Sequence, residues 1–170
     1  SFQIVLYEFG GNTGTYLDAP FHRHPDGADL SDLPLEKLAN LPGLVVTAPR
    51  EGVIGAEHVP ADIAGRAVLF FTGWSEKWGS ADYFRSGPFL TFEACHRLVK
   101  EQAALVGIDC ANIDNMNDAA RPAHTVLLAA GILIVEHLCR LEALAGKRFR
   151  FLAAPPAIRP SVFECLSKPR

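Results

Sequence analysis

Three short apolar runs constrain the fold of this 170-residue chain more than any other feature. They are AVLFFT at 67–72, LVGI at 105–108 and ILIVE at 132–136. Each run is short and almost continuously apolar, which is the pattern of a strand buried on both faces of a sheet. Helical patterns lie between successive runs. The alternation predicts an α/β fold in a single domain with a mixed central sheet.

The helical patterns have recognisable ends. The first follows Thr91, a residue type that caps helix N-termini, and we expect this helix to extend to about Leu105. The second begins at Pro122, which suits a first helical turn, and runs through Ala130 to a stop at glycine. The face of the first helix expected to pack on the sheet consists of Phe92, Cys95, Leu98, Val99 and Gln102.

The remaining predicted elements are short. They are strands over 3–9, 44–48 and 148–153, a short helix that starts at Ser31, and a helical turn over 57–63. The expected domain covers residues 1–170, with the proline-rich stretch 155–170 as a peripheral tail. The chain starts at Ser1 without a methionine, directly in a predicted strand, so an incomplete N-terminal part remains an open alternative.

The composition is that of a soluble globular protein, with 49% hydrophobic and 21% charged residues. The net charge of -3 and the scattered basic residues form no stripe for a nucleic acid. The longest apolar run, 126–135, is far shorter than the roughly 20 residues needed to span a bilayer. The four cysteines form no CxxC pair, so we expect reduced thiols in a cytoplasmic protein.

The stretch NTGTYLDAPFHRH, residues 12–24, concentrates the polar groups expected to carry chemistry. Asp18 and His22 are four residues apart with Pro20 between them, and proline favours a turn or strand end over a helix interior. We expect this turn to present a metal ligand and a proton-transfer group. The alternatives are an Asp18 that caps the turn and a His22 that is an ordinary surface histidine.

Two further polar residues interrupt apolar surroundings. His124 lies near the start of the second predicted helix, and Glu136 ends the last buried strand. A buried carboxylate without a partner costs several kcal/mol, so Glu136 should be paired, metal-bound or turned to solvent. A partner such as Arg121 or Arg140 is one possibility. Together with Asp18, the two residues also make a plausible three-ligand site for zinc or manganese.

These motifs resemble the metal-dependent cyclase and kynurenine formamidase family, which includes isatin hydrolases. The family signature is HxGTHxDxPxH, followed by GxD, PxHxxLL and an apolar strand that ends in Glu. The matching pieces are NTGTYLDAPFH at 12–22, VGID at 106–109, RPAHTVLL at 121–128 and ILIVEHL at 132–138. The resemblance covers about residues 3–153 and implies the swivelling β/β/α domain, usually as a homodimer or homotetramer.

The resemblance also implies roles for individual residues. Asp18, His124 and Glu136 match metal ligands, and His22 matches the catalytic histidine. Asn12 and Tyr16 stand where the family has the two histidines of its first metal site. A neutral amide or a protonated phenol replaces imidazole poorly as a ligand. We therefore expect one divalent metal, zinc or manganese, held by the three retained ligands.

The expected activity is hydrolysis of a small cyclic amide or N-formyl compound. The metal would activate water and polarise the carbonyl, and His22 would pass a proton to the leaving nitrogen. Two alternatives remain: a metal-free binding or assembly protein, and a stabilising hydrogen-bond network from Asn12 and Tyr16 to Asp18. Three roles are open for the aromatic residues that follow the run at 67–72: the lining of a pocket for a flat substrate, a part of the core, or a subunit interface. These residues are Trp74, Trp78, Tyr83 and Phe84.

Overall fold

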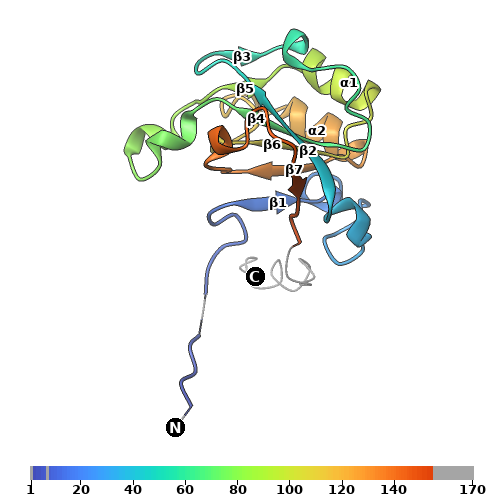
Figure 1. The fold of residues 1–170 in the computed structure, drawn as a ribbon. Coiled ribbons are helices and arrows are strands. Elements are labelled where there is room, and N and C mark those ends of the chain that lie inside the picture. The colour runs from blue at the N-terminus through green and yellow to red at the C-terminus, as the bar shows by residue number, and fades with distance from the viewer. Residues whose placement is uncertain (1, 7, 155–170) are drawn as a thin grey trace.

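A computed structural model describes residues 2–6 and 8–154, and a six-stranded sheet organises them (Figure 1). Its strand order is β1-β7-β6-β4-β2-β8. The strands are β1 (Tyr16–Asp18), β2 (Leu41–Thr47), β4 (Ala67–Phe71), β6 (Leu105–Ile108), β7 (Leu133–Glu136) and β8 (Arg150–Phe151). A separate two-stranded sheet pairs β3 (Val53–Ile54) with β5 (Phe89–Leu90). The predicted α/β domain with a mixed sheet is confirmed.

The centre of the large sheet is parallel and its two edges are antiparallel. Strands β2, β4, β6 and β7 run parallel to one another, while β1 pairs antiparallel with β7 and β8 antiparallel with β2. The central strands β4, β6 and β7 are buried along almost their whole length, as their continuous apolar sequences require. Edge strand β1 brings residues from the start of the chain beside the last central strand.

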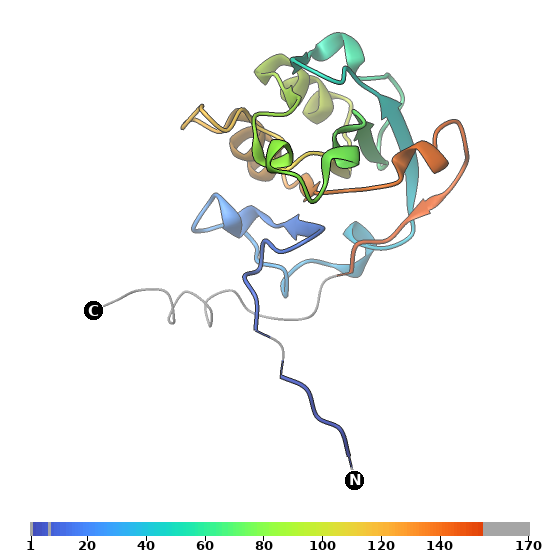
Figure 2. The same ribbon diagram turned by 90° about the vertical axis from the view of Figure 1, so that its left-hand side faces the viewer.

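The side chains of the central strands alternate between two cores. Val68, Phe70 and Ile134 face the core shared with the two α-helices, α1 (Phe92–Lys100) and α2 (Pro122–Ala129). Leu69 and Val135 face the opposite core, which is closed by residues from 33–41 and 138–153. The helices α1 and α2 pack against each other on one side of the curled sheet (Figures 1 and 2).

Helix α1 begins where the sequence predicts and ends earlier. The Thr91 hydroxyl accepts the Ala94 backbone N–H at 3.2 Å, as expected of an N-cap. The helix stops at Lys100 rather than near Leu105, because the chain reverses at Gln102 in the left-handed region (φ 57°). Phe92, predicted on the packed face, is 52% exposed, while Ala94 is buried in its place together with Cys95 and Leu98.

Several short elements differ from their predicted form. The strand expected over 3–9 is absent from its described residues, because the segment before Thr15 lies outside the sheet and has no partner strand there. The helix expected from Ser31 is a single 3₁₀ turn at Leu35–Lys37, and the turn over 57–63 is Ala56–His58. Strand β8 is shorter than 148–153. The expected tail, 155–170, lies outside the described residues.

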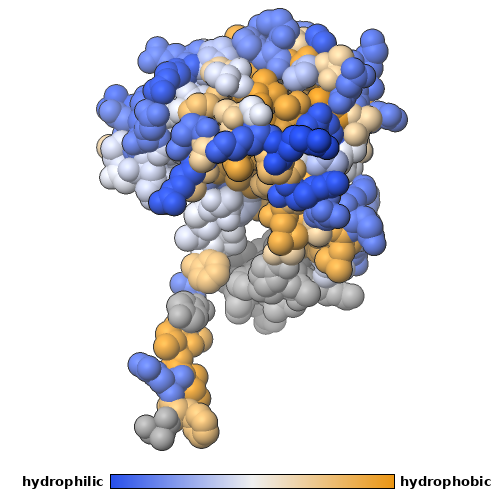
Figure 3. Space-filling model, in the orientation of Figure 1, coloured by the Kyte–Doolittle hydropathy of each residue, from blue (hydrophilic) through white to orange (hydrophobic). Residues whose placement is uncertain are grey.

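The N-terminal segment carries apolar side chains into solvent. Phe2, Ile4 and Leu6 are each at least 88% exposed, and the segment extends away from the domain (Figures 1 and 3). The expected homodimer or homotetramer stays a prediction. Within the described part of the chain, none of the helices has the length and apolar character needed to cross a membrane.

Of the four cysteines, three lie in the described part of the chain, and all three are free thiols, as predicted. Cys95 and Cys110 are buried and Cys139 is exposed. Cys165 lies outside the described residues. Burial raises the pKa of the Cys95 thiol to about 12.

Candidate metal centre

Strand β1 places two polar side chains of the N-terminal motif beside Glu136. In the antiparallel pairing of β1 with β7, Tyr16 lies opposite Glu136 and Asp18 lies opposite Ile134. Residues two apart in a strand share a face, so Tyr16, Asp18 and Glu136 all project to the side of the sheet on which Ile134 meets the helices. Edge pairing thus joins residues about 120 positions apart.

Helix α2 contributes His124, and Asp114 fixes its position. The carboxylate of Asp114 accepts the backbone N–H groups of Ala123 (2.6 Å) and His124 (3.1 Å) at the start of α2. The same carboxylate accepts the Nδ1–H of the His124 ring at 2.6 Å. Because Nδ1 carries that proton, Nε2 is the ring nitrogen left to bind a cation. Asp114 is therefore an orienting group for His124.

The remaining nitrogen of His124 faces both predicted carboxylate ligands. Its Nε2 lies 3.5 Å from Asp18 Oδ2 and 3.8 Å from Glu136 Oε1. All three residues are at least 94% buried, and Asp18 Oδ2 is buried with no hydrogen-bond partner. An oxygen in that state calls for a cation. A carboxylate–imidazole–carboxylate set also has the donor chemistry that zinc and manganese accept, so these residues fit a divalent metal.

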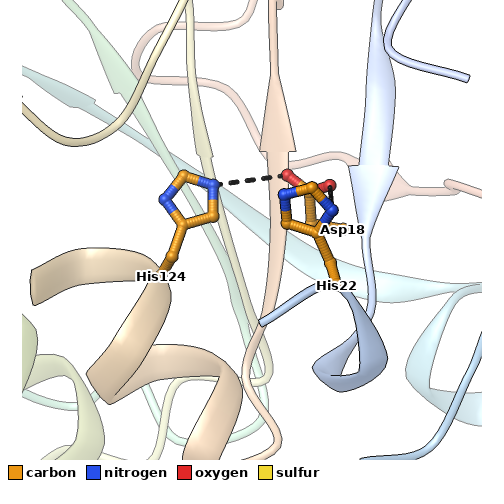
Figure 4. A group of neighbouring side chains, drawn as sticks. All are labelled: Asp18, His22 and His124. Atoms are coloured by element: carbon orange, nitrogen blue, oxygen red, sulfur yellow. Dashed lines mark ion pairs between the residues drawn. The ribbon is translucent and has the colours of Figure 1, made fainter. Parts of the chain in front are cut away.

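His22 is the exposed member of this group, and its ring lies beside Asp18 (Figure 4). It ends a 3₁₀ turn, Pro20–His22, which the proline starts. Its Nδ1 is 3.6 Å from Asp18 Oδ1, its ring centroid is 5.7 Å from that of His124, and its side chain is 47% exposed. Potential ligand atoms of Asp18, His22 and His124 all lie within 4.8 Å of one another. The predicted proton-transfer residue and two of the three predicted ligands, Asp18 and His124, therefore form one close group, which does not include Glu136.

Glu136 is satisfied by hydrogen bonds rather than by an arginine. Its Oε1 accepts the backbone N–H of Ile113 at 2.7 Å, and its Oε2 accepts the phenol O–H of Tyr16. Burial and the negative charge of Glu136 keep the pKa of Tyr16 far above its ordinary value, so the phenol is a donor. The hydroxyl of Tyr16 therefore bonds Glu136, whereas the sequence led us to consider Asp18 as its partner. An ion pair with Arg121 or Arg140 is not among the interactions of the described residues.

The electrostatics of the centre favour a cation at His124. Burial disfavours the imidazolium, but the hydrogen bond to Asp114 and the negative charges of Asp18 and Glu136 outweigh it and raise the pKa of His124 to about 9. Burial raises the pKa of Glu136. For Asp114, burial is outweighed by the donors from His124 and the helix N-terminus, which lower its pKa. The cluster therefore binds a proton at His124 when no metal occupies that place.

The aromatic loop after β4 divides into buried and exposed members. Trp74 and Tyr83 are buried, while Trp78 and Phe84 are 58% and 61% exposed. Sequence reasoning missed that this loop meets His137, the residue after Glu136. The Tyr83 hydroxyl bonds His137 Nδ1 at 2.8 Å, and the Trp78 and Tyr16 rings lie 5.8 Å and 5.3 Å from the His137 ring.

Asp109, the other loop carboxylate, has a structural role. It accepts the Thr72 backbone N–H (3.0 Å), the Thr72 hydroxyl (2.6 Å) and the Gly73 N–H (2.8 Å). These bonds tie the end of β6 to the start of the aromatic loop. A surface groove of about 750 Å³ lies at Gly43, Arg66 and Arg150 and contains no member of the cluster, so it is not part of this site.

Comparison with known proteins decides the family. The family model Cyclase, described as "Putative cyclase", matches residues 4–115, which include Asp18 and His22. The chain belongs to the cyclase family. Its mixed α/β sheet agrees with the fold of cyclase-family hydrolase structures.

Individual relatives agree with this assignment. Kynurenine formamidase from Geobacillus thermodenitrificans is 30% identical over 147 residues, which cover 85% of this cyclase-family chain and 68% of that protein. Isatin hydrolase A from Ralstonia solanacearum has a TM-score of 0.77 at 27% identity, covering 88% of this chain and 68% of that one. A structure described as a potential metal-dependent hydrolase with cyclase activity has a TM-score of 0.77 at 28% identity, covering 89% and 74%.

Proposed function

We propose that this chain is a metal-dependent hydrolase that cleaves the C–N bond of a small cyclic amide or N-formyl compound. The observation that carries the proposal is the buried, unpartnered Asp18 Oδ2, which faces His124 Nε2 at 3.5 Å. Two atoms that present lone pairs to each other need a proton or a metal cation between them. Relatives named kynurenine formamidase and isatin hydrolase A support a hydrolytic reaction.

Asp18, His124 and Glu136 would hold one divalent ion, zinc or manganese. Asp114 prepares the site by fixing the tautomer and the orientation of His124. When bound, such an ion supplies Lewis acidity, which polarises an amide carbonyl and makes a water molecule more acidic. The surrounding burial of the three ligands keeps bulk water from weakening these interactions.

His22 is the proton-transfer residue in this proposal. Its ring is half exposed and reaches solvent, while Nδ1 lies 3.6 Å from Asp18 Oδ1. In this role His22 takes a proton from water. The same ring then returns that proton to the leaving nitrogen, so that an amide breaks into a carboxylic acid and an amine.

A flat aryl group is the substrate portion that the surroundings favour. The exposed ring of Trp78 stands beside His137, whose ring also meets Tyr16 next to Glu136. An aromatic surface that adjoins a polar cluster suits a substrate with a ring and an amide. Trp78 is the residue of this group most available to a ligand.

Hydrolysis of an aryl formamide such as formanilide tests the proposal. The purified chain, loaded with Zn²⁺ or Mn²⁺, should release formate, and His22→Ala should lower kcat about 100-fold or more while the ion stays bound. His96→Ala is the matched control, because His96 is exposed on α1, away from the cluster. Equal kcat for both variants would remove His22 from the reaction.

A second candidate is a binding or assembly protein without metal. The Tyr16–Glu136 hydrogen bond favours it, because that bond satisfies Glu136 in the absence of an ion. Folded protein that takes up neither Zn²⁺ nor Mn²⁺ and leaves formanilide intact would establish this candidate over the hydrolase.

A further inference from the structure

Tyr16 has a hydrogen bond to the centre that the proposed reaction does not use. We propose that Tyr16 is a positioning residue, whose phenol holds Glu136 so that only Oε1 faces His124 and the centre accepts a single metal ion. This inference rests on the proposed metal site and assigns a role to a residue outside the proposed ligand set.

The two oxygens of Glu136 have different environments. Oε1 accepts the Ile113 N–H at 2.7 Å and lies 3.8 Å from His124 Nε2, so it faces the cluster. Oε2 accepts the Tyr16 hydroxyl. Glu136 is 1% exposed, so water does not compete for either oxygen. Donors on both oxygens therefore fix the orientation of the carboxylate before any ion arrives.

Tyr16 is itself held in place. It is the cross-strand partner of Glu136 in the β1–β7 pair, and its ring packs 5.3 Å from that of His137. The residue two positions along the same strand face is Asp18, the proposed ligand. The phenol therefore lies on the cluster side of the sheet, between the edge strand and Glu136.

The position of the phenol limits the number of ions. A second ion that bound Glu136 Oε2 would have to displace the hydroxyl that already donates to that oxygen. Within residues 2–6 and 8–154, the potential ligand atoms form a single close group, that of Asp18, His22 and His124. The Tyr16 hydroxyl thus occupies the position beside Oε2 in which a second cation would contact that oxygen.

Titration with Co²⁺ tests this role without reference to turnover. Wild-type protein should bind one Co²⁺ per chain. Tyr16→Phe keeps the ring and removes the hydroxyl, so the affinity for Co²⁺ should fall about 10-fold or more and the visible spectrum of bound Co²⁺ should change. Tyr83→Phe is the matched control, because it removes another tyrosine hydroxyl bond, the one to His137, and should leave both readouts unchanged.

A double-mutant cycle isolates the path of the effect. If Tyr16 acts through Glu136, then Tyr16→Phe should weaken Co²⁺ binding in the wild-type background and have no further effect in a Glu136→Gln background. Effects that multiply in the double variant would show that Tyr16 acts by another route and overturn the proposal.

Other outcomes are equally decisive. A folded Tyr16→Phe protein with wild-type affinity and spectrum overturns the proposal, as does wild-type protein that binds two ions or none. If Tyr16→Phe does not fold, Tyr83→Phe protein provides a second test, because it keeps Tyr16. Addition of Co²⁺ should then change the near-ultraviolet tyrosine absorption of this variant. An unchanged absorption overturns the proposal. The proposed function can fail on its own. A protein that does not hydrolyse formanilide, but whose Co²⁺ affinity still depends on Tyr16, would contradict the hydrolase and leave the role of Tyr16 standing.

Discussion

His124 Nδ1 lies 2.6 Å from Asp114 Oδ2, and the same carboxylate accepts the backbone N–H of His124. One buried side chain therefore anchors the start of α2 and orients the imidazole that the helix carries. Orientation of a ligand histidine by a carboxylate is a recurrent feature of metal sites. In this chain it also couples the stability of the helix to the geometry of the centre.

Replacement of Asp114 by alanine should weaken Zn²⁺ binding by 10- to 100-fold, about the range seen for groups that orient metal ligands. The reason is that His124 loses both its preferred tautomer and its fixed orientation. Isothermal titration with Zn²⁺ measures the change. Asp118→Ala is the control, because the side chain of Asp118 accepts an exposed turn N–H, that of Ala120, and its loss should leave the affinity unchanged. Equal losses in the two variants would contradict the orienting role.

The stability of the metal-free protein should decrease as pH rises through the titration of His124. The hydrogen bond from His124 to Asp114 and the nearby negative charges of Asp18 and Glu136 help to raise its pKa from 6.5 to about 9 in the folded state. The charged pair therefore contributes full stability below about pH 6.5 and loses it as the pH passes 9. Urea unfolding between pH 6 and 10, in the presence of a chelator, measures this slope. His124→Gln should flatten it, and an unchanged slope would assign the effect to other groups.

Loss of the Asp109 carboxylate should destabilise the fold without acting on the metal cluster. Asp109→Ala leaves the Thr72 hydroxyl and the N–H groups of Thr72 and Gly73 without their acceptor, at a cost of about 3 kcal/mol. Denaturant unfolding gives the value. The exposed Asp32→Ala should change the unfolding free energy by less than about 0.5 kcal/mol. A similar small effect at Asp109 would show that its loop is not held by these bonds.

The cysteines should differ in their reaction with iodoacetamide. Cys139 is exposed and should be modified rapidly at pH 8, whereas Cys95 is buried with its pKa raised to about 12 and should stay protected until the protein unfolds. Burial likewise raises the pKa of Cys110. Peptide mass spectrometry resolves the rates at individual cysteines. Modification of Cys95 as fast as Cys139 in folded protein would contradict the core described above.

The central strands and the two helices were predictable because local pattern and tertiary environment agree there. The runs at 67–72, 105–108 and 132–136 are apolar on both faces, and each is buried on both faces in the structure. The first helix was predicted too long because the left-handed turn at Gln102 has no strong sequence signal. The strand expected over 3–9 is not formed by the described residues of that range, because strand propensity needs a partner strand and the sheet provides none beside them.

The candidate centre was predictable as a set of residues but not as an arrangement. The motifs brought Asp18, His22, His124 and Glu136 together, and the structure places them in contact. Strand β1 is only three residues long, so its register against β7 could not be read from the sequence. That register is what directs Tyr16 to Glu136 rather than to Asp18.

A metal centre built on Asp18 and His124 should hold a divalent ion, and elemental analysis of the purified full chain measures whether it does. After incubation with Zn²⁺ or Mn²⁺ and dialysis, wild-type protein should retain about one ion per chain, and folded Asp18→Ala protein should retain almost none. Folded wild-type protein that retains no ion, or Asp18→Ala protein that retains as much as wild type, would contradict the account.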